Sequence, residues 1–404
     1  MKVVSVSDFH NLGRAVRAAL LLLPLILAVL WCGRLTAGDI VRPGELWPDE
    51  SGRHINAHGG GILAYGGRYY WYGEDKDART NAALVGVSCY SSRNLKKWRR
   101  LSVALSVDTT DAASPIARGC IIERPKVIYC AGTGQFVMWF HLELRDKGYR
   151  AAMAGVAVAD RPEGPFRFLR ASRVNAGRLP SGYTEEDVQM LDSLRYTMKL
   201  KWWTPEWRRG VEAGVYMRRD MDGGQMARDM QLFVDSDGKA YHIYASEENL
   251  TIQIAELTDD YTAHTGRYVR VAPGGQNEAP VLFRHGGYYW MITSGCTGWA
   301  PNAARLYRAR SIMGPWEGNL YNPCCEGNDR RPVEKTFLGQ GTYALPYGKG
   351  IIFMADEWRP NHPSDGRYLW LPISFDRDGG PQIKWRDSWS LKKLKAGKYN
   401  DYPE

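Results

Sequence analysis

Cysteine is scarce in this sequence, and no cysteine has the spacing of a metal ligand. The chain has 404 residues and only seven cysteines, without any CxxC pair or His/Cys cluster. The adjacent Cys324 and Cys325 are poorly placed to bind one zinc ion together. We therefore expect no metal and no cofactor. Six cysteines follow residue 38, an even number that is compatible with disulfides in an oxidising compartment.

The sequence also lacks a basic track. The formal net charge is +9, but residues 1–38 carry four Lys or Arg and one Asp, which leaves +6 on the rest. Lysines and arginines do not alternate with aromatic residues in any run of the kind that binds nucleic acid. This pattern indicates a basic solvated surface. We expect no nucleic-acid partner and a monomeric protein.

Long apolar runs are absent except near the N-terminus. The run from Ala18 to Trp31 is short for a membrane span, follows basic residues and precedes the small residues Thr36-Ala37-Gly38. Residues 1–38 are thus predicted to be a signal peptide cleaved near Ala37, with an uncleaved anchor or a lipidated Cys32 as alternatives. In each case we expect an exported protein (periplasmic, cell-surface or secreted) with no membrane contact beyond the N-terminal segment.

Tyrosine, tryptophan and glycine are abundant, with 23, 15 and 43 residues, and they form a repeat. A glycine-containing turn is followed five times by an aromatic, alternating segment, and a short apolar stretch precedes each turn. Such a unit is typical of a β-hairpin. The copies begin at Gly66, Gly134, Asp237, Gly286 and Gly348.

Further strand-like segments follow most of the hairpins, as in Gly86–Ser92 and Ala154–Asp160. A hairpin and two further strands make a four-stranded sheet. The repeat therefore predicts an all-β fold, a five-bladed β-propeller of four-stranded antiparallel blades, with residues 39–404 as one catalytic domain.

One interval between turns is longer than the others. The excess lies at about residues 175–222, which are rich in Arg, Trp and Met. We expect an insertion that forms a surface loop over one face, because the segment has too few apolar residues to build a core of its own.

Polar residues begin the predicted first strands of the blades. In a propeller these strands line the central axis, so Glu123, Asp229 and Glu278 are expected to converge. Glycosidic cleavage needs a carboxylic acid that protonates the leaving oxygen, and inverting enzymes add a base roughly 6.5–9.5 Å away. Partial burial would raise the pKa of Glu278 and keep it protonated, which makes it the candidate general acid.

Several segments in order resemble glycoside hydrolase family 43, whose members are five-bladed propellers. The resemblance runs from about residue 50 to 390 and is greatest to the branch with exo-β-1,3-galactanases. It rests on residues 55–61, Trp71-Tyr72-Gly73-Glu74, Glu123-Arg124-Pro125-Lys126, Asn277-Glu278-Ala279-Pro280 and residues 293–299.

This resemblance implies roles for individual residues. Glu278 matches the family's general acid and Asp229 the residue that tunes it, whereas Ala57-His58 stand where most members have a base. In the galactanase branch a glutamine from the last blade and the Glu of the Glu-Arg-Pro-Lys motif serve near the reacting sugar, and Gln340 and Glu123 match them. Glycines flank Gln340 where relatives usually have serines. We expect Gln340 to orient water, with Glu74, Glu123 or His58 as alternatives for taking the proton.

The predicted substrate-binding residues are aromatic platforms and polar partners of sugar hydroxyls. They are His58, Glu74, Trp139, Tyr149, Thr297, Trp299 and Trp358. The resemblance implies an exo-acting, inverting hydrolase that removes terminal galactosyl residues from a plant-type polysaccharide such as arabinogalactan. An α-L-arabinofuranosidase or galactofuranosidase and a non-catalytic propeller that binds galactose- or arabinose-containing saccharides are the alternatives.

Overall fold

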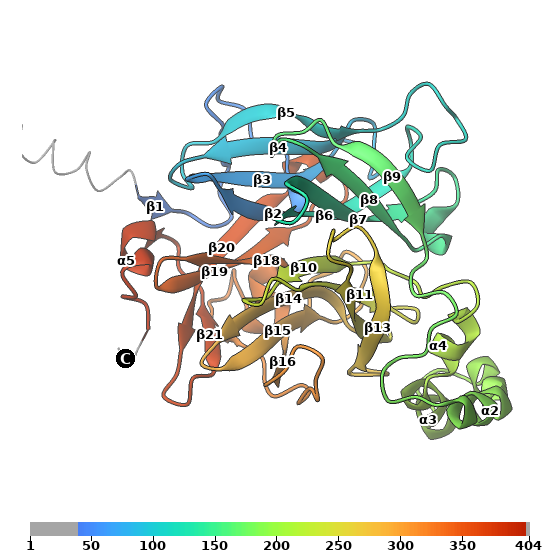
Figure 1. The fold of residues 1–404 in the computed structure, drawn as a ribbon. Coiled ribbons are helices and arrows are strands. Elements are labelled where there is room, and N and C mark those ends of the chain that lie inside the picture. Colours follow the sequence, from blue (N-terminus) through green and yellow to red (C-terminus); the bar gives the residue numbers. More distant parts are fainter. Residues whose placement is uncertain (1–38, 401–404) are drawn as a thin grey trace, which may run out of the picture.

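The computed structural model describes residues 39–400, which form a closed ring of β-sheets (Figure 1). The innermost strand of each sheet contacts the innermost strand of the next sheet, and the last contacts the first. The predicted five-bladed propeller is thereby confirmed. The inner strands are β2 (His58–Tyr65), β6 (Ile121–Cys130), β10 (Met230–Val234), β14 (Glu278–His285) and β18 (Gln340–Tyr347).

Three blades have four antiparallel strands in chain order, as predicted. Blade 1 adds β3 (Arg68–Asp75), β4 (Gly86–Ser92) and β5 (Arg99–Ser106); blade 2 adds β7 (Gln135–Glu143), β8 (Met153–Ala159) and β9 (Arg167–Ser172); blade 3 adds β11 (Ala240–Ser246), β12 (Thr251–Leu257) and β13 (His264–Val271). The 3-10 helix η1 (Gly148–Arg150) follows β7.

The last two blades depart from four strands. Blade 4 has three, ending with β15 (Tyr288–Ser294) and β16 (Arg305–Ala309), and blade 5 has five, because the parallel strand β17 (Cys324–Glu326) adds to β19 (Gly350–Glu357), β20 (Arg367–Phe375) and β21 (Pro381–Lys384). The 3-10 helices η3 (Val333–Leu338) and η4 (Pro363–Asp365) lie in the connections of blade 5.

Apolar side chains fill the spaces between neighbouring blades, one cluster for each of the five junctions. The junction of blades 5 and 1 shows why the sequence is rich in tryptophan. Trp71, Trp98 and Trp370 are each at most 1% exposed there and pack edge to face or tilted against one another. Such wide rings span the gap between two twisted sheets.

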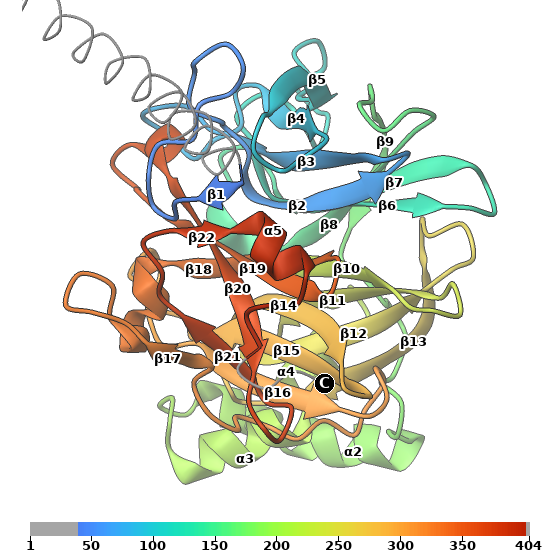
Figure 2. The same cartoon turned by 90° about the vertical axis from the view of Figure 1, so that its left-hand side faces the viewer.

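The two ends of the described chain meet outside the blades (Figure 2). Strand β1 (Ile40–Val41) pairs with β22 (Trp389–Ser390), and helix α5 (Leu391–Lys395) follows directly. Within residues 39–400, no helix combines the length and the apolar character needed to cross a bilayer. The predicted signal peptide, anchor and lipidation site fall outside the described residues.

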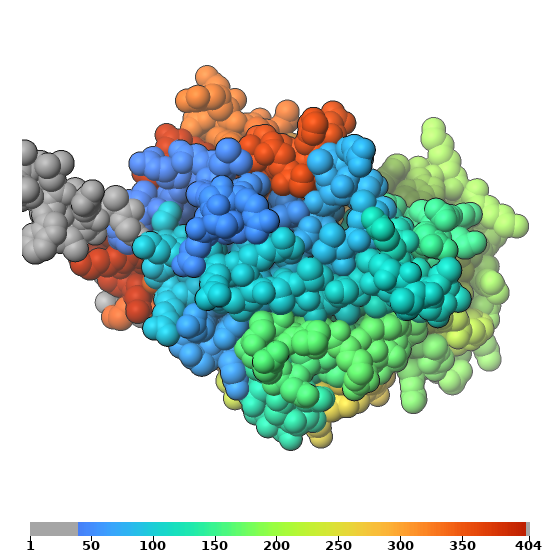
Figure 3. Space-filling model, turned by 90° about the horizontal axis from the view of Figure 1, so that it is seen from above, coloured from blue at the N-terminus to red at the C-terminus, as the bar shows by residue number. Residues whose placement is uncertain are grey.

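The insertion at about residues 175–222 is helical, which differs from the expected loop. It contains α2 (Glu185–Ser193), η2 (Arg195–Lys199), α3 (Pro205–Ala213) and α4 (Val215–Asp220). Thr184 and Thr204 cap α2 and α3, as their sequences favour. The helices enclose a small apolar cluster that also includes Leu250 of blade 3. The core of the insertion is therefore not built from its own apolar residues alone. Figure 3 shows the insertion (yellow-green) at the edge of the molecule.

Five cysteines of the described chain form no disulfide, although the even number of cysteines after residue 38 is compatible with disulfides. Cys89, Cys120, Cys130, Cys296 and Cys324 are all free. Four of the five are buried and pack as small apolar side chains.

Candidate active site

A β-bulge recurs near the start of three inner strands, and in two of them it orients a glutamate towards the central axis. In β2, β6 and β14 the antiparallel register shifts directly after His58, Glu123 and Glu278, of which the two glutamates face the site. The next residue has a positive φ in each case: Gly59 (+61°), Arg124 (+54°) and Ala279 (+52°). A β-bulge redirects the side chain at its position, and here it turns Glu123 and Glu278 towards the axis.

The second strand of each blade ends at the same edge, because the two strands are antiparallel. Glu123 thus stands opposite His141, Glu278 opposite Ser294, and Gln340 opposite Asp356. In blade 1 the approach is closer, since a Cβ on Gly60 would lie only 1.7 Å from the carbonyl oxygen of Tyr72. Only glycine fits there, which explains the glycine-rich start of β2.

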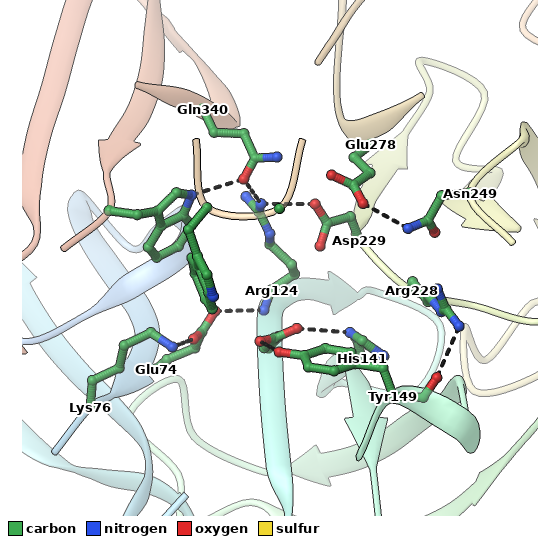
Figure 4. Close-up of a pocket in the computed structure, with 14 residues that line it drawn as sticks. Glu74, Lys76, Arg124, His141, Tyr149, Arg228, Asp229, Asn249, Glu278 and Gln340 are labelled. Carbon is green, nitrogen blue, oxygen red and sulfur yellow. Dashed lines mark hydrogen bonds and ion pairs between the residues drawn. The ribbon is translucent and has the colours of Figure 1, made fainter. Parts of the chain in front are cut away.

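These edges surround a cavity of about 260 Å³ (Figure 4). Eight of the eleven predicted site residues line it, and they come from all five blades. They are Glu74, Glu123, Tyr149, Asp229, Glu278, Trp299, Gln340 and Trp358.

Glu278 lies at one wall of the cavity. Asn249 Nδ2 donates a hydrogen bond of 2.7 Å to Glu278 Oε1. Burial and the nearby charge of Asp229 raise the pKa of Glu278 to about 7, partly opposed by Arg124. A large fraction of this carboxyl therefore carries its proton near neutral pH, as a general acid must.

The guanidinium of Arg124 joins three blades at the bottom of the cavity. It donates to Asp229 Oδ2 (2.8 Å), to Gln340 Oε1 (2.5 Å) and to the carbonyl oxygen of Gly341 (3.0 Å). Its backbone N–H also donates to Glu74 Oε1 at 3.0 Å. The side chain is 5% exposed, so its charge depends on these partners.

Glu123 is the centre of a second network. Tyr149 OH donates to Glu123 Oε1 at 2.6 Å, and His141 Nδ1 lies 3.1 Å from Oε2. On its other side His141 Nε2 lies 2.9 Å from Glu143 Oε1. Burial alone would raise the pKa of Glu123, but the hydrogen bonds and charge of His141 lower it. Burial alone would lower the pKa of His141, and the two carboxylates raise it. The histidine is thus cationic and Glu123 ionised.

The opposite wall combines a charge pair with aromatic rings. Lys76 Nζ lies 2.5 Å from Glu74 Oε2 and about 6 Å from the ring centres of Trp299 (6.0 Å) and Trp358 (5.7 Å). The two indoles meet edge to face with centres 5.8 Å apart. Trp299 is 39% exposed and offers its ring to the cavity mouth. Aromatic faces of this kind suit the apolar face of a sugar ring.

The amide of Gln340 is fixed on both sides. Its Oε1 accepts from Arg124 and, at 2.8 Å, from Trp358 Nε1, while its Nε2 donates to Ser294 Oγ at 2.9 Å. Both lone pairs of the amide oxygen are used. Gln340 is thus held as a rigid hydrogen-bonding group, and its role in orienting water stays a prediction.

Three predicted substrate-binding residues do not line the cavity. His58 is fully buried and stacks on Tyr368 with ring centres 5.3 Å apart. Trp139 lies in the middle of β7, packs between blades 2 and 3 at 2% exposure, and donates to the carbonyl oxygen of Tyr261. Thr297 Oγ1 bonds within its own loop, to the carbonyl oxygen of Ala300.

The lining also includes residues that the sequence reasoning did not select. Four of them lie near the end of a second strand or after it: Lys76 (β3), His141 (β7), Asn249 (β11) and Gly298 (β15). The other two, Arg124 and Arg228, are sequence neighbours of the predicted Glu123 and Asp229. The missed signal was the hairpin itself, since its antiparallel strands bring the end of the second strand beside the start of the first.

Glu123, His141 and Asp229 are close enough to share a cation, with ligand atoms within 4.8 Å of one another. However, Arg124 already neutralises Asp229, and His141 and Tyr149 already bond Glu123. We expect activity without added metal, measured as unchanged turnover after dialysis against EDTA. A loss that one divalent metal restores would contradict this expectation.

The family model described as glycosyl hydrolases family 43 matches residues 211–343, which include Asp229, Glu278 and Gln340. A solved family 43 β-1,3-galactosidase bound to galactodeoxynojirimycin is 52% identical, with 87% of this chain and 100% of that chain covered and a TM-score of 0.82. The chain belongs to glycoside hydrolase family 43.

Other solved family 43 enzymes agree. An exo-β-1,3-galactanase from Clostridium thermocellum is 34% identical, covering 86% of this chain and 66% of that chain with a TM-score of 0.67. A variant of the exo-β-1,3-galactanase from Phanerochaete chrysosporium, solved with β-1,3-galactotriose, is 31% identical, covering 90% and 71% with a TM-score of 0.70. The resemblance seen in the motifs is confirmed, and the protein is a glycosidase by family.

Proposed function

We propose that this family 43 glycosidase is an exo-acting β-1,3-galactosidase that removes terminal galactosyl residues. The observation that carries the proposal is Glu278, a carboxyl whose pKa is raised to about 7 inside a small cavity between blades. The cavity volume of about 260 Å³ is below the roughly 300–1,000 Å³ of typical drug-sized sites, which favours one terminal sugar over a continuous chain. The solved relatives named as galactosidase and galactanases support the same sugar.

In the reaction Glu278 donates its proton to the glycosidic oxygen as that bond breaks, and a water attacks the anomeric carbon from the opposite face. Asp229, paired with Arg124, disfavours a second negative charge on Glu278. Gln340 contributes hydrogen bonding rather than basicity, because its oxygen is already doubly occupied. The water's proton passes to a carboxylate, Glu123 or Glu74.

Product analysis tests the proposal. Incubation with arabinogalactan and with arabinan, followed by chromatography and NMR, is expected to release free galactose from arabinogalactan alone. The first product should be α-galactose, the inverted anomer. Release of arabinose would favour the arabinofuranosidase alternative. Oligosaccharide binding without any turnover would favour a non-catalytic propeller. That alternative is motivated by Ala57-His58, which stand where most family members have the catalytic base.

We also propose that the natural substrate is a plant-type arabinogalactan and that the enzyme is exported as a monomer. The apolar run Ala18–Trp31 supports export. Detection of the enzyme in the culture medium or cell envelope, with a new N-terminus near Ala37, is the expected result.

A further inference from the structure

One turn of blade 3 has an unusual backbone and touches the general acid. Glu247, Glu248 and Asn249, which connect β11 to β12, have φ values of +54°, +61° and +61°. Three consecutive non-glycine residues in the left-handed region are costly and persist only when their surroundings hold them. The last of them, Asn249, donates to Glu278 Oε1. Whatever holds this turn therefore also sets the position of the acid.

A buried ion pair fixes the first residue of the turn. Glu247 is fully buried, and both its oxygens lie 2.8 Å from the guanidinium of Arg270, through Nε and Nη2. The same guanidinium reaches the helical insertion. It donates to the carbonyl oxygens of Val211 (2.8 Å) and Glu212 (3.0 Å) at the end of α3, and to Tyr183 OH (2.6 Å). The last carbonyls of a helix lack internal partners and attract a cation.

Two further contacts join the turn to the insertion. Arg219 of α4 lies 3.0 Å from Glu248 Oε1. Leu250, which follows Asn249, is fully buried in the apolar cluster of the insertion beside Trp207 and Val211. Glu248 and Leu250 thus contact the insertion directly, and Asn249 faces Glu278. Glu247 contacts the insertion only through Arg270 of β13, and it also accepts from Thr251 and Gln253 of its own blade.

The insertion itself stays away from the cavity. None of residues 175–222 is among the cavity-lining residues of the described chain. Figure 1 places α2, α3 and α4 at the outer side of the ring, near β13, which carries Arg270. Its effect on the site is therefore indirect.

We propose that the helical insertion is a positioning element for the general acid, acting through Arg270 and Arg219 on the turn 247–250. This inference rests on the proposed function. The insertion keeps Asn249 on one oxygen of Glu278, so that the protonated carboxyl faces the leaving oxygen. Arg270 and Arg219 are positioning residues that never touch the substrate.

Leaving-group dependence tests this role. A β-1,3-linked galactobiose needs its leaving oxygen protonated, whereas the phenolate of 2,4-dinitrophenyl β-galactopyranoside departs without a proton. We expect Arg270→Gln to lower kcat on the disaccharide about tenfold or more, because acid catalysis contributes roughly 10²–10⁴-fold. On the aryl galactoside the loss should stay within about twofold. Arg219→Gln, which leaves the buried pair intact, should show the same selectivity with a smaller loss.

Arg218→Gln is the matched control. Arg218 is the neighbour of Arg219 in α4, and it pairs at 3.1 Å with Asp192 of α2, inside the insertion. This variant should keep both activities. Equal losses on the two substrates in the Arg270 and Arg219 variants, or no loss in either, would overturn the inference while leaving the proposed function intact. A wild-type enzyme that cleaves neither substrate would refute both.

Discussion

Replacing Glu278 with glutamine is expected to lower kcat on β-1,3-galactobiose by about 10³-fold, the middle of the range for general acid catalysis. The amide keeps the shape and can still accept from Asn249 through its oxygen, but it has no acidic proton to transfer to the leaving oxygen. Wild-type activity should fall as pH rises through about 7, because Glu278 is active only when protonated and its pKa is raised to about 7. The residual activity of the variant should lack this alkaline limb. Initial rates across a pH series measure both effects.

Glu317→Gln is the control for this substitution. Glu317 is a surface carboxylate that pairs with Arg308 on blade 4, and its side chain is 55% exposed. Its kcat and pH profile should match the wild type, since exposed ion pairs contribute little. If Glu278→Gln retained full turnover of the disaccharide, the acid would have to be another residue.

Replacing Arg124 with methionine should have the largest effect on stability. The guanidinium is buried and neutralises Asp229, and it also satisfies Gln340 and the carbonyl oxygen of Gly341. Removing one partner of a buried ion pair costs about 3–5 kcal/mol, because the remaining charge stays buried without compensation. Guanidinium chloride denaturation should show a free energy of unfolding that is lower by that amount.

A double variant separates the charge from the packing. In Arg124→Met combined with Asp229→Asn no buried carboxylate is left unpaired, and the amide oxygen can still accept from the backbone N–H of Ala279, 3.1 Å from Asp229. We expect the double variant to be more stable than Arg124→Met alone, with a coupling energy of about 1–3 kcal/mol. An unchanged denaturation midpoint in the single variant would show that Arg124 is not needed to hold the blades.

The fold was readable from the sequence because each blade repeats the same local chemistry. Glycine turns between aromatic strands mark the five hairpins, and no long-range knowledge is needed to count them. The helical insertion was misjudged for the opposite reason. Its core includes Leu250 from another blade, and a contact between distant segments leaves no mark in the local composition.

The site was readable in large part, because eight of the eleven predicted residues line the cavity. Glu123 and Glu278 follow from register and chemistry and Gln340 from the family resemblance, whereas His58, although it begins β2, does not line the cavity. Trp139 lies in the middle of β7 and packs between blades 2 and 3, a contact with another blade that the local pattern does not show. The contacts of Arg124 with Asp229 and Gln340 could not be foreseen, because they join blades that lie over a hundred residues apart in sequence.

The pairing of β1 with β22 leaves every blade made from one uninterrupted stretch of chain. Asp39 and Tyr399, near the two ends, both contact Ser390. The ring therefore has no obligatory starting blade. A circularly permuted chain, with residues 39 and 400 joined by a short linker and new ends in the exposed connection 109–113 between blades 1 and 2, is expected to keep every blade uninterrupted. The order of the blades along the chain is therefore set only by which connection between blades carries the two termini.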